Sequence, residues 1–146
     1  HLSLKRERNT IMSFVRDLAI KIASPGKPVS SLSGGNQQKV VIAKALMTNP
    51  KVLLMDEPSR GIDVGAKAEV FRTMRGLAAQ GLGILFVTSD LGEAMSLSDR
   101  IIVMSHSRVA DAFTQAEASE AKIIAASAVG QAPPSHQARV ARVSQP

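Results

Sequence analysis

The sequence predicts an α/β domain in which helices flank a mostly parallel sheet, and two observations support this fold class. Short apolar runs alternate along the chain with longer amphipathic segments, which is the order typical of strands joined by helical crossovers. The runs at residues 52–55, 84–87 and 101–104 are continuous rather than alternating in hydrophobicity. Continuous runs indicate strands that are covered on both faces, as in a parallel sheet.

Three amphipathic helices are predicted around the first two runs. Apolar side chains at three- and four-residue spacing mark residues 11–22, and Pro25 ends that helix. A second helical pattern covers residues 36–48. A third covers residues 65–80, where Gly81 is the expected C-cap because glycine readily adopts the left-handed conformation that commonly ends a helix.

The C-terminal third of the chain predicts a hairpin followed by a helix. Residues 108–113 form a fourth strand, which returns from the third run across a turn at residues 105–107. Thr114 and Glu117 have the spacing of a capping box, in which each side chain bonds the backbone of the other residue. The final helix is therefore expected from this box to about Ala128.

The composition is that of a soluble globular domain followed by a tail. The chain has 146 residues, of which 45% are hydrophobic and 21% are charged, and it has no cysteine for a disulfide or thiolate metal site. No apolar run approaches the roughly 18 residues of a membrane span. Residues 1–130 are expected to form the folded domain, and residues 131–146, which lack apolar periodicity, a disordered tail. The start at His1 rather than at Met predicts an N-terminal truncation.

The net charge of +6 does not indicate a nucleic-acid partner, because the excess lies at the two ends of the chain. Residues 1–30 carry six basic and two acidic side chains, whereas residues 31–130 carry ten of each. With four Phe and no Trp or Tyr, the chain also offers few aromatic rings on which bases could stack. We therefore expect no nucleic acid among its partners.

A glycine-rich turn before the second helix is the first candidate for chemistry. Gly34 and Gly35 allow a close approach of the backbone to a ligand, and the amides at a helix N-terminus favour a phosphate. Ser33 is placed either to cap that helix or to donate a hydroxyl hydrogen bond to the phosphate. Taken alone, the Ser-Gly-Gly turn favours a plain connection from loop to helix over a phosphate site.

Two adjacent carboxylates at the end of the first strand are the second candidate. Asp56 and Glu57 follow the run at 52–55, at the carboxyl end of a strand, which is where α/β sheets bind ligands. Asp56 is suited to hold Mg²⁺ through water, and Glu57 to polarise a water molecule for attack on a γ-phosphate. The alternative is that Asp-Glu-Pro is only a polar exit from the strand.

Together, the two segments resemble the motifs of one family. Leu32-Ser33-Gly34-Gly35-Asn36-Gln37-Gln38 and Leu53-Leu54-Met55-Asp56-Glu57-Pro58 resemble the signature and Walker B motifs of ATP-binding-cassette (ABC) ATPases. Residues 59–63 resemble the D-loop, in which Asp63 would meet the opposite subunit, besides capping the next helix. The resemblance covers about residues 10–128. It implies a partial P-loop NTPase domain with part of the helical signature subdomain.

A finer resemblance points to sugar importers. Residues 36–39 and 60–67 resemble the second cassette of double-cassette ATP-binding subunits of the ribose, galactose and xylose type. The resemblance implies ATP and Mg²⁺ as cofactors and a place at the cytoplasmic face of the bacterial plasma membrane. The implied partners are a first cassette, membrane permease subunits and, indirectly, a periplasmic sugar-binding protein.

The resemblance also assigns roles to the candidate residues. Cassettes of this family pair head to tail, so a signature loop closes over ATP that the other cassette holds. The residues implied in that contact are Ser33, Gly34, Gly35, Gln38 and Asp63. Asp56 as metal ligand and Glu57 as catalytic residue would instead serve a phosphate loop of their own cassette.

Two departures from the family pattern limit the expected activity. No G-x-x-x-x-G-K-[ST] phosphate loop occurs in the chain, and Ser89 stands where the family usually has a switch histidine. The isolated chain is therefore expected to be inactive as an ATPase. The alternatives are a truncated, non-catalytic remnant and a non-transport ABC ATPase, although the chain lacks the coiled-coil or zinc insertion expected of the latter.

Overall fold

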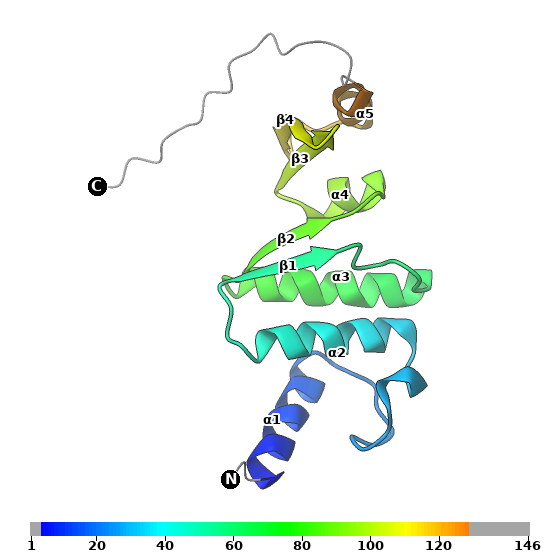
Figure 1. Ribbon diagram of the computed structural model, residues 1–146, viewed down its shortest axis with the longest axis vertical. Helices are drawn as coiled ribbons and strands as arrows, with labels where there is room; N and C mark the ends of the chain where they lie inside the picture. Colours follow the sequence, from blue (N-terminus) through cyan, green and yellow to red (C-terminus); the bar gives the residue numbers. More distant parts are fainter. Residues whose placement is uncertain (1–3, 129–146) are drawn as a thin grey trace, which may run out of the picture. The chain divides into compact units, whose positions relative to one another are not determined.

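The computed structural model describes residues 4–128, and these form two compact units that divide after Asp90 (Figure 1). The predicted tail, residues 131–146, lies outside the described residues. The first unit contains α1 (Leu4–Asp17), the 3-10 turn η1 (Val29–Ser31), α2 (Gly34–Leu46), β1 (Val52–Asp56), α3 (Val64–Ala79) and β2 (Gly83–Val87). The second unit contains α4 (Leu91–Leu97), β3 (Arg100–Ser105), β4 (Arg108–Thr114) and α5 (Glu120–Ala128). The α/β class is confirmed.

The first helix ends five residues before the predicted position. Ala19 adopts a left-handed conformation, with φ of +48°, directly after α1. Its amide donates to the Arg16 carbonyl at 3.0 Å, and the amide of Ile20 donates to the Val15 carbonyl at 2.8 Å. This pair of bonds is a Schellman motif, which closes a helix C-terminus. The prediction that the helix runs to residue 22 is wrong, because the last apolar residues of the stripe reach the core from an extended segment.

The second and third helices follow the sequence prediction closely. α3 ends in the same motif as α1, here with a glycine: the amide of Gly81 donates to the Ala78 carbonyl, and that of Leu82 to the Leu77 carbonyl. Gly81 has φ of +93°, so the predicted C-cap is confirmed. α2 and α3 lie side by side, and α3 packs against the strands (Figure 1).

The core of the first unit lies between these helices and one face of a parallel strand pair. β1 and β2 are in register from Val52 opposite Gly83 to Asp56 opposite Val87. The buried residues that form this core come from α2, β1, α3 and the segment after α1: Leu18, Ile20, Ile42, Ala43, Leu53, Met55, Val70 and Met74. The N-termini of α2 and α3 also meet, because Gly35 lies against Ala66.

The other face of the strand pair is exposed within the described residues. Leu54 and Leu85 lie opposite each other, with 71% and 54% of their surfaces exposed. Val52 and Val87 share this face. The expectation that these strands are covered on both faces is therefore not met within the first unit, because no other element of that unit packs on this side.

The second unit is a hairpin packed on a helix. β3 and β4 are antiparallel, with an irregularity between Val103 and Met104, and His106 and Ser107 both have positive φ in the connecting turn. Two positive φ values in a two-residue loop are typical of the turn that matches strand twist. α5 packs on β3, and the shared core consists of Ile101, Val103, Ile123 and Ala126. The predicted fourth strand and turn are confirmed.

The second unit differs from the prediction in the start of α5 and in an additional short helix. The capping-box contacts exist, because a carboxylate oxygen of Glu117 accepts from the backbone amide and the hydroxyl of Thr114 at 3.0 and 2.7 Å. However, they close a turn, and α5 begins only at Glu120, with the Ser119 hydroxyl accepting from the Lys122 amide. The short helix α4 was not predicted, because its seven residues show no full amphipathic period.

Candidate functional site

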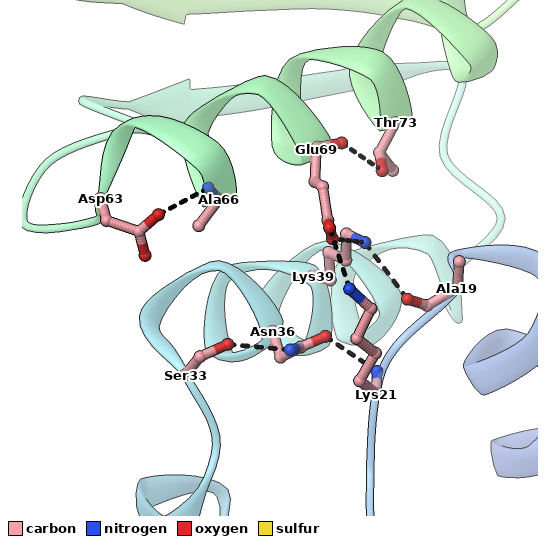
Figure 2. Close-up of polar contacts among 9 residues, drawn as sticks. All are labelled: Ala19, Lys21, Ser33, Asn36, Lys39, Asp63, Ala66, Glu69 and Thr73. Atoms are coloured by element: carbon pink, nitrogen blue, oxygen red, sulfur yellow. Dashed lines mark hydrogen bonds and ion pairs between the residues drawn. The ribbon is translucent and has the colours of Figure 1, made fainter.

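The signature segment forms the N-terminus of α2 and is held by side-chain amides. Ser33 occupies the N-cap position, but its hydroxyl makes no capping bond and instead accepts from Nδ2 of Asn36 at 2.8 Å. Oδ1 of the same buried Asn36 accepts from the backbone amide of Lys21 at 2.8 Å (Figure 2). Nε2 of Gln37 donates to the Leu32 carbonyl at 2.8 Å. The first amides of α2 are therefore left uncapped by Ser33, as an anion site at a helix N-terminus requires.

Gly34 and Gly35 are needed inside the protein as well. A Cβ atom on Gly35 would lie 2.6 Å from the Cβ atom of Ala66, and one on Gly34 would lie 2.8 Å from Cγ2 of Ile62. The first contact is with the Cβ atom of Ala66, which cannot move without its backbone, whereas the second is with a methyl group that can move by rotation of the Ile62 side chain. From the sequence, the two glycines are expected either to admit a phosphate or to form a plain turn from loop to helix. The structure adds a packing role that pattern alone could not reveal.

Asp63 lies at the start of α3, close in the chain to the residues that pack on the glycines. Its Oδ1 atom accepts from the backbone amide of Ala66 at 2.9 Å, so the predicted N-cap is confirmed. Its side chain is exposed, which leaves the predicted contact with an opposite subunit as a prediction. The side chain of Gln38, half-buried in α2, makes no hydrogen bond with another described residue.

The two carboxylates diverge at the end of β1. Asp56 is exposed, and its side chain makes no hydrogen bond or ion pair with the described residues. Glu57 has φ of +44°, a conformation that costs a residue with a Cβ atom roughly 1–2 kcal/mol. Its amide donates to the Val87 carbonyl at 2.8 Å, which continues the pairing of the strands. One carboxylate therefore faces solvent while the other turns toward the loop after β2.

Glu57 and Ser89 are in direct contact. Oε1 of Glu57 accepts from the backbone amide of Ser89 at 2.9 Å, although the two residues are 32 positions apart. The position that sequence analysis assigned to a switch histidine thus lies beside the predicted catalytic carboxylate. Strand pairing explains this, because the carboxyl ends of parallel strands meet at one edge of a sheet. No hydrogen bond or ion pair between described residues joins this group to the signature segment.

A buried lysine supports the signature helix, and sequence analysis missed it. Only 4% of the side chain of Lys39 is exposed, and its Nζ atom lies 3.0 Å from Oε2 of Glu69 and 3.2 Å from the Ala19 carbonyl (Figure 2). Nζ of Lys21 lies 3.1 Å from the other oxygen of Glu69. Hydrogen bonds and charge from Lys39 and then Lys21 lower the pKa of Glu69 to about 2.

The position of Lys39 on α2 was an available signal. It follows the buried Asn36 by three residues and therefore lies on the same helix face, where a lysine needs a partner. The cluster ties the segment after α1, α2 and α3 together. It positions the signature helix rather than contacting a ligand.

Residues 4–128 contain neither a metal-binding cluster nor a membrane-spanning helix. No group of three or more histidine or carboxylate side chains is placed to hold a metal ion by itself. Within the same range, no helix is long and apolar enough to cross a membrane. His106 lies exposed in the hairpin turn, and its ring contacts only the neighbouring Ser105 hydroxyl among the described polar groups.

Comparison with known proteins identifies relatives of this site. The family described as ABC transporter matches residues 3–60. The ribose import ATP-binding protein RbsA of Caldanaerobacter subterraneus subsp. tengcongensis is 45% identical over 123 residues, which are 84% of this chain and 25% of that protein. The xylose import ATP-binding protein XylG of Moorella thermoacetica is 47% identical over 139 residues, covering 88% of this chain and 28% of that protein. The chain thus spans about a quarter of the length of the curated relatives it matches.

Solved structures agree with these relatives. The dimeric ATP-binding cassette MJ0796, in a post-hydrolysis state bound to ADP and Pi, is similar with a TM-score of 0.67 and 25% identity, over 79% of this chain and 50% of that one. The cassette MJ1267 of an ABC transporter is similar with a TM-score of 0.72 and 25% identity, over 86% of this chain and 51% of that one. The described fold is therefore about half of such a cassette.

Proposed function

Because this chain belongs to the ABC transporter family of ATP-binding proteins, we propose that it is the C-terminal part of a second cassette in a double-cassette sugar importer. In the complete protein, ATP hydrolysis would drive the import of a monosaccharide or polyol. The observation that carries this proposal is the contact between Glu57 and the Ser89 amide at the carboxyl ends of β1 and β2. The ribose and xylose import relatives support the transport role. Residues 1–130 would be the cassette part, and residues 131–146 a dispensable tail.

The signature segment would act on a nucleotide held by another cassette. The uncapped amides at the start of α2 offer donors to a γ-phosphate, and the exposed hydroxyl of Ser33 can add another. Gly34 and Gly35 would let the phosphate approach, and Gln38 and Asp63 would lie at the edge of the contact. The dimeric state of one solved relative is in keeping with this arrangement.

The carboxylate pair would serve the nucleotide of its own cassette. The exposed Asp56 carboxylate, which has no partner in the described residues, suits a hard cation such as Mg²⁺ that keeps most of its waters. Bound Mg²⁺ would neutralise charge on the β- and γ-phosphates. In this arrangement the protein would supply only one ligand to Mg²⁺, and the described residues contain no group of three or more that could hold a metal ion by themselves.

Glu57 would be the general base of hydrolysis. Its carboxylate would accept a proton from the water that attacks the γ-phosphorus, while the bond to the leaving ADP oxygen breaks. The Ser89 amide fixes one carboxylate oxygen at 2.9 Å and thereby orients the other. A serine in place of the switch histidine cannot supply an imidazole to the phosphate, so this half would turn over more slowly than its partner.

The partners follow from the proposed transport role. We place the complete protein at the cytoplasmic face of the bacterial plasma membrane, bound to permease subunits. A first cassette would complete each nucleotide site, and a periplasmic sugar-binding protein would act indirectly through the permease. The import names of the relatives support this placement.

Reconstitution of the complete transporter tests the proposed function. ATPase activity should rise when the sugar-loaded binding protein is added, and Ser33→Ala should reduce that stimulated activity by removing a phosphate donor. Ser30→Ala is a matched control, since Ser30 is an exposed serine in η1 outside the proposed contact. Absence of sugar-stimulated ATPase activity in the wild-type transporter would contradict the proposal.

A further inference from the structure

The loop after β2 is attached to the rest of the first unit at two points. One is the hydrogen bond from the Ser89 amide to Glu57. The other is an ion pair in which Nζ of Lys67, on α3, lies 2.9 Å from Oδ2 of Asp90. Within the loop, the Asp90 amide also donates to the Thr88 hydroxyl at 3.0 Å. Because Ser89 and Asp90 are neighbours, a restraint on the Asp90 carboxylate limits the movement of the Ser89 amide.

Lys67 is itself held in place. It lies in the first turn of α3, where its amide donates to the Asp63 carbonyl at 2.8 Å and the preceding Ala66 is fixed by the Asp63 cap. Its ammonium group lies 5.6 Å from the centre of the Phe71 ring, one helical turn further on. A cation over an aromatic face is attracted to the ring, which narrows the range of lysine conformations.

We infer that Lys67 is a positioning residue that holds the loop 88–90 so that the Ser89 amide stays bonded to Glu57. It acts through Asp90 and touches neither the carboxylate of Glu57 nor the proposed nucleotide. The restraint on the loop stands on the contacts described above. Its consequence for catalysis rests on the proposed function, in which Glu57 is the general base.

The solvent exposure of the Lys67–Asp90 ion pair indicates that it affects the loop 88–90 more than the stability of the whole domain. The side chains of Lys67 and Asp90 are 29% and 49% exposed, and ion pairs of this kind add little to the stability of a whole domain. The small energy of this ion pair is nevertheless enough to change the fraction of time for which the hydrogen bond between the Ser89 amide and Glu57 is open. Loss of the pair should therefore alter the Ser89 amide far more than the unfolding midpoint.

Hydrogen exchange in the complete protein tests the restraint without reference to ATP. Lys67→Met keeps a side chain of similar length but removes the charge, and with it both the ion pair with Asp90 and the attraction to the Phe71 ring. We expect the Ser89 amide to exchange about two- to fivefold faster, the range that an exposed ion pair can produce. Asp90→Asn should give the same increase, and the double substitution should give no more than either single one. Lys67→Arg should keep the wild-type rate.

The control is Lys44→Met, which removes a charge from an exposed position on α2 away from the loop. It should leave the Ser89 exchange unchanged. Unchanged exchange in both Lys67→Met and Asp90→Asn would overturn the inference. So would an increase in Lys67→Met that spread evenly over the amides of α3, because that would be general loosening of the helix.

Kinetics of the complete transporter then test the catalytic consequence. With the faster nucleotide site of the other cassette inactivated, Lys67→Met should lower the remaining kcat for ATP about two- to fivefold and leave KM unchanged, because the nucleotide contacts are intact. Lys67→Arg should restore kcat. Faster exchange of the Ser89 amide with unchanged kcat would contradict the role of the loop in catalysis. It would still support the inference that Lys67 restrains the loop. A wild-type transporter without ATPase activity would instead mean that the proposed function has failed, and the exchange result would still stand.

Discussion

Gly35 of α2 rests directly on Ala66 of α3, since a Cβ atom added to the glycine would come within 2.6 Å of the alanine Cβ atom. The N-terminal turns of the two helices therefore meet without an intervening side chain. The turn of α2 carries the signature residues, and the turn of α3 carries Asp63 and Lys67. A change in the spacing of these helices would therefore move the signature residues relative to Asp63 and Lys67.

Gly35→Ala should destabilise the protein. The added methyl group meets a rigid atom, so the helices must separate, at a cost of about 1–3 kcal/mol for overpacking of this kind. Urea unfolding of the complete protein measures the change. Gly76→Ala is the matched control, because a Cβ atom there, in the interior of α3, would meet nothing within 4 Å. Alanine at that position should stabilise the helix by up to about 1 kcal/mol. Equal loss in both variants would contradict the packing role of Gly35.

Substitution of the signature glycine should harm transport more than substitution of the catalytic carboxylate. Gly34→Asp would bring a negative charge against the phosphate held by the other cassette, and stimulated ATPase activity should nearly vanish. Glu57→Gln should do less harm, because Ser89 marks this half as the slower site. Near-total loss of activity in Glu57→Gln as well would refute the asymmetry.

The structure requires a control for Gly34→Asp, because any Cβ atom at this position displaces the Ile62 side chain. Gly34→Ala produces the same steric contact without the charge. It should retain a substantial part of the activity that Gly34→Asp loses. If the alanine variant is equally inactive, packing rather than phosphate contact accounts for the requirement for glycine.

The carboxylate of Glu69 should make stability depend on acidic pH. Its pKa in the folded protein is lowered to about 2 from an ordinary value of 4.5, because the bonds from Lys39 and Lys21 favour the charged form. The resulting stabilisation is complete above the ordinary value and is lost as the pH falls from about 4.5 toward 2. In urea unfolding, the stability difference between wild type and Glu69→Gln should shrink across this window. A constant difference between wild type and Glu69→Gln would contradict the role of the cluster.

The isolated chain of residues 1–146 should neither bind MgATP tightly nor hydrolyse it. Its sequence contains no phosphate loop, whose amides and lysine normally surround the β- and γ-phosphates. Titration calorimetry measures the affinity, and release of phosphate measures turnover. Micromolar affinity accompanied by turnover would show that the chain has a nucleotide site of another kind.

Local sequence alone determined much of this protein. The apolar runs placed the strands, and Gly81 and Asp63 marked the end and the start of α3, because each of these signals acts within a few residues. The same is true of the carboxylates at the end of β1, since the end of a strand can be read from its hydrophobicity. The α/β class and the candidate residues required nothing more.

Tertiary structure decided the features that depend on residues distant in the chain. α1 stops at Asp17 because the following residues reach a core made mainly of other elements, although Ala19 carries no sequence signal for a left-handed turn. Lys39 is buried because Glu69, thirty positions later, neutralises its charge. The roles of Gly35 and Lys67 likewise depend on partners across a helix interface and across a loop. Hydrophobic periodicity and helix caps depend on interactions within a few residues of the chain. The contacts of Lys39, Gly35 and Lys67 arise only when the folded chain brings separate segments together.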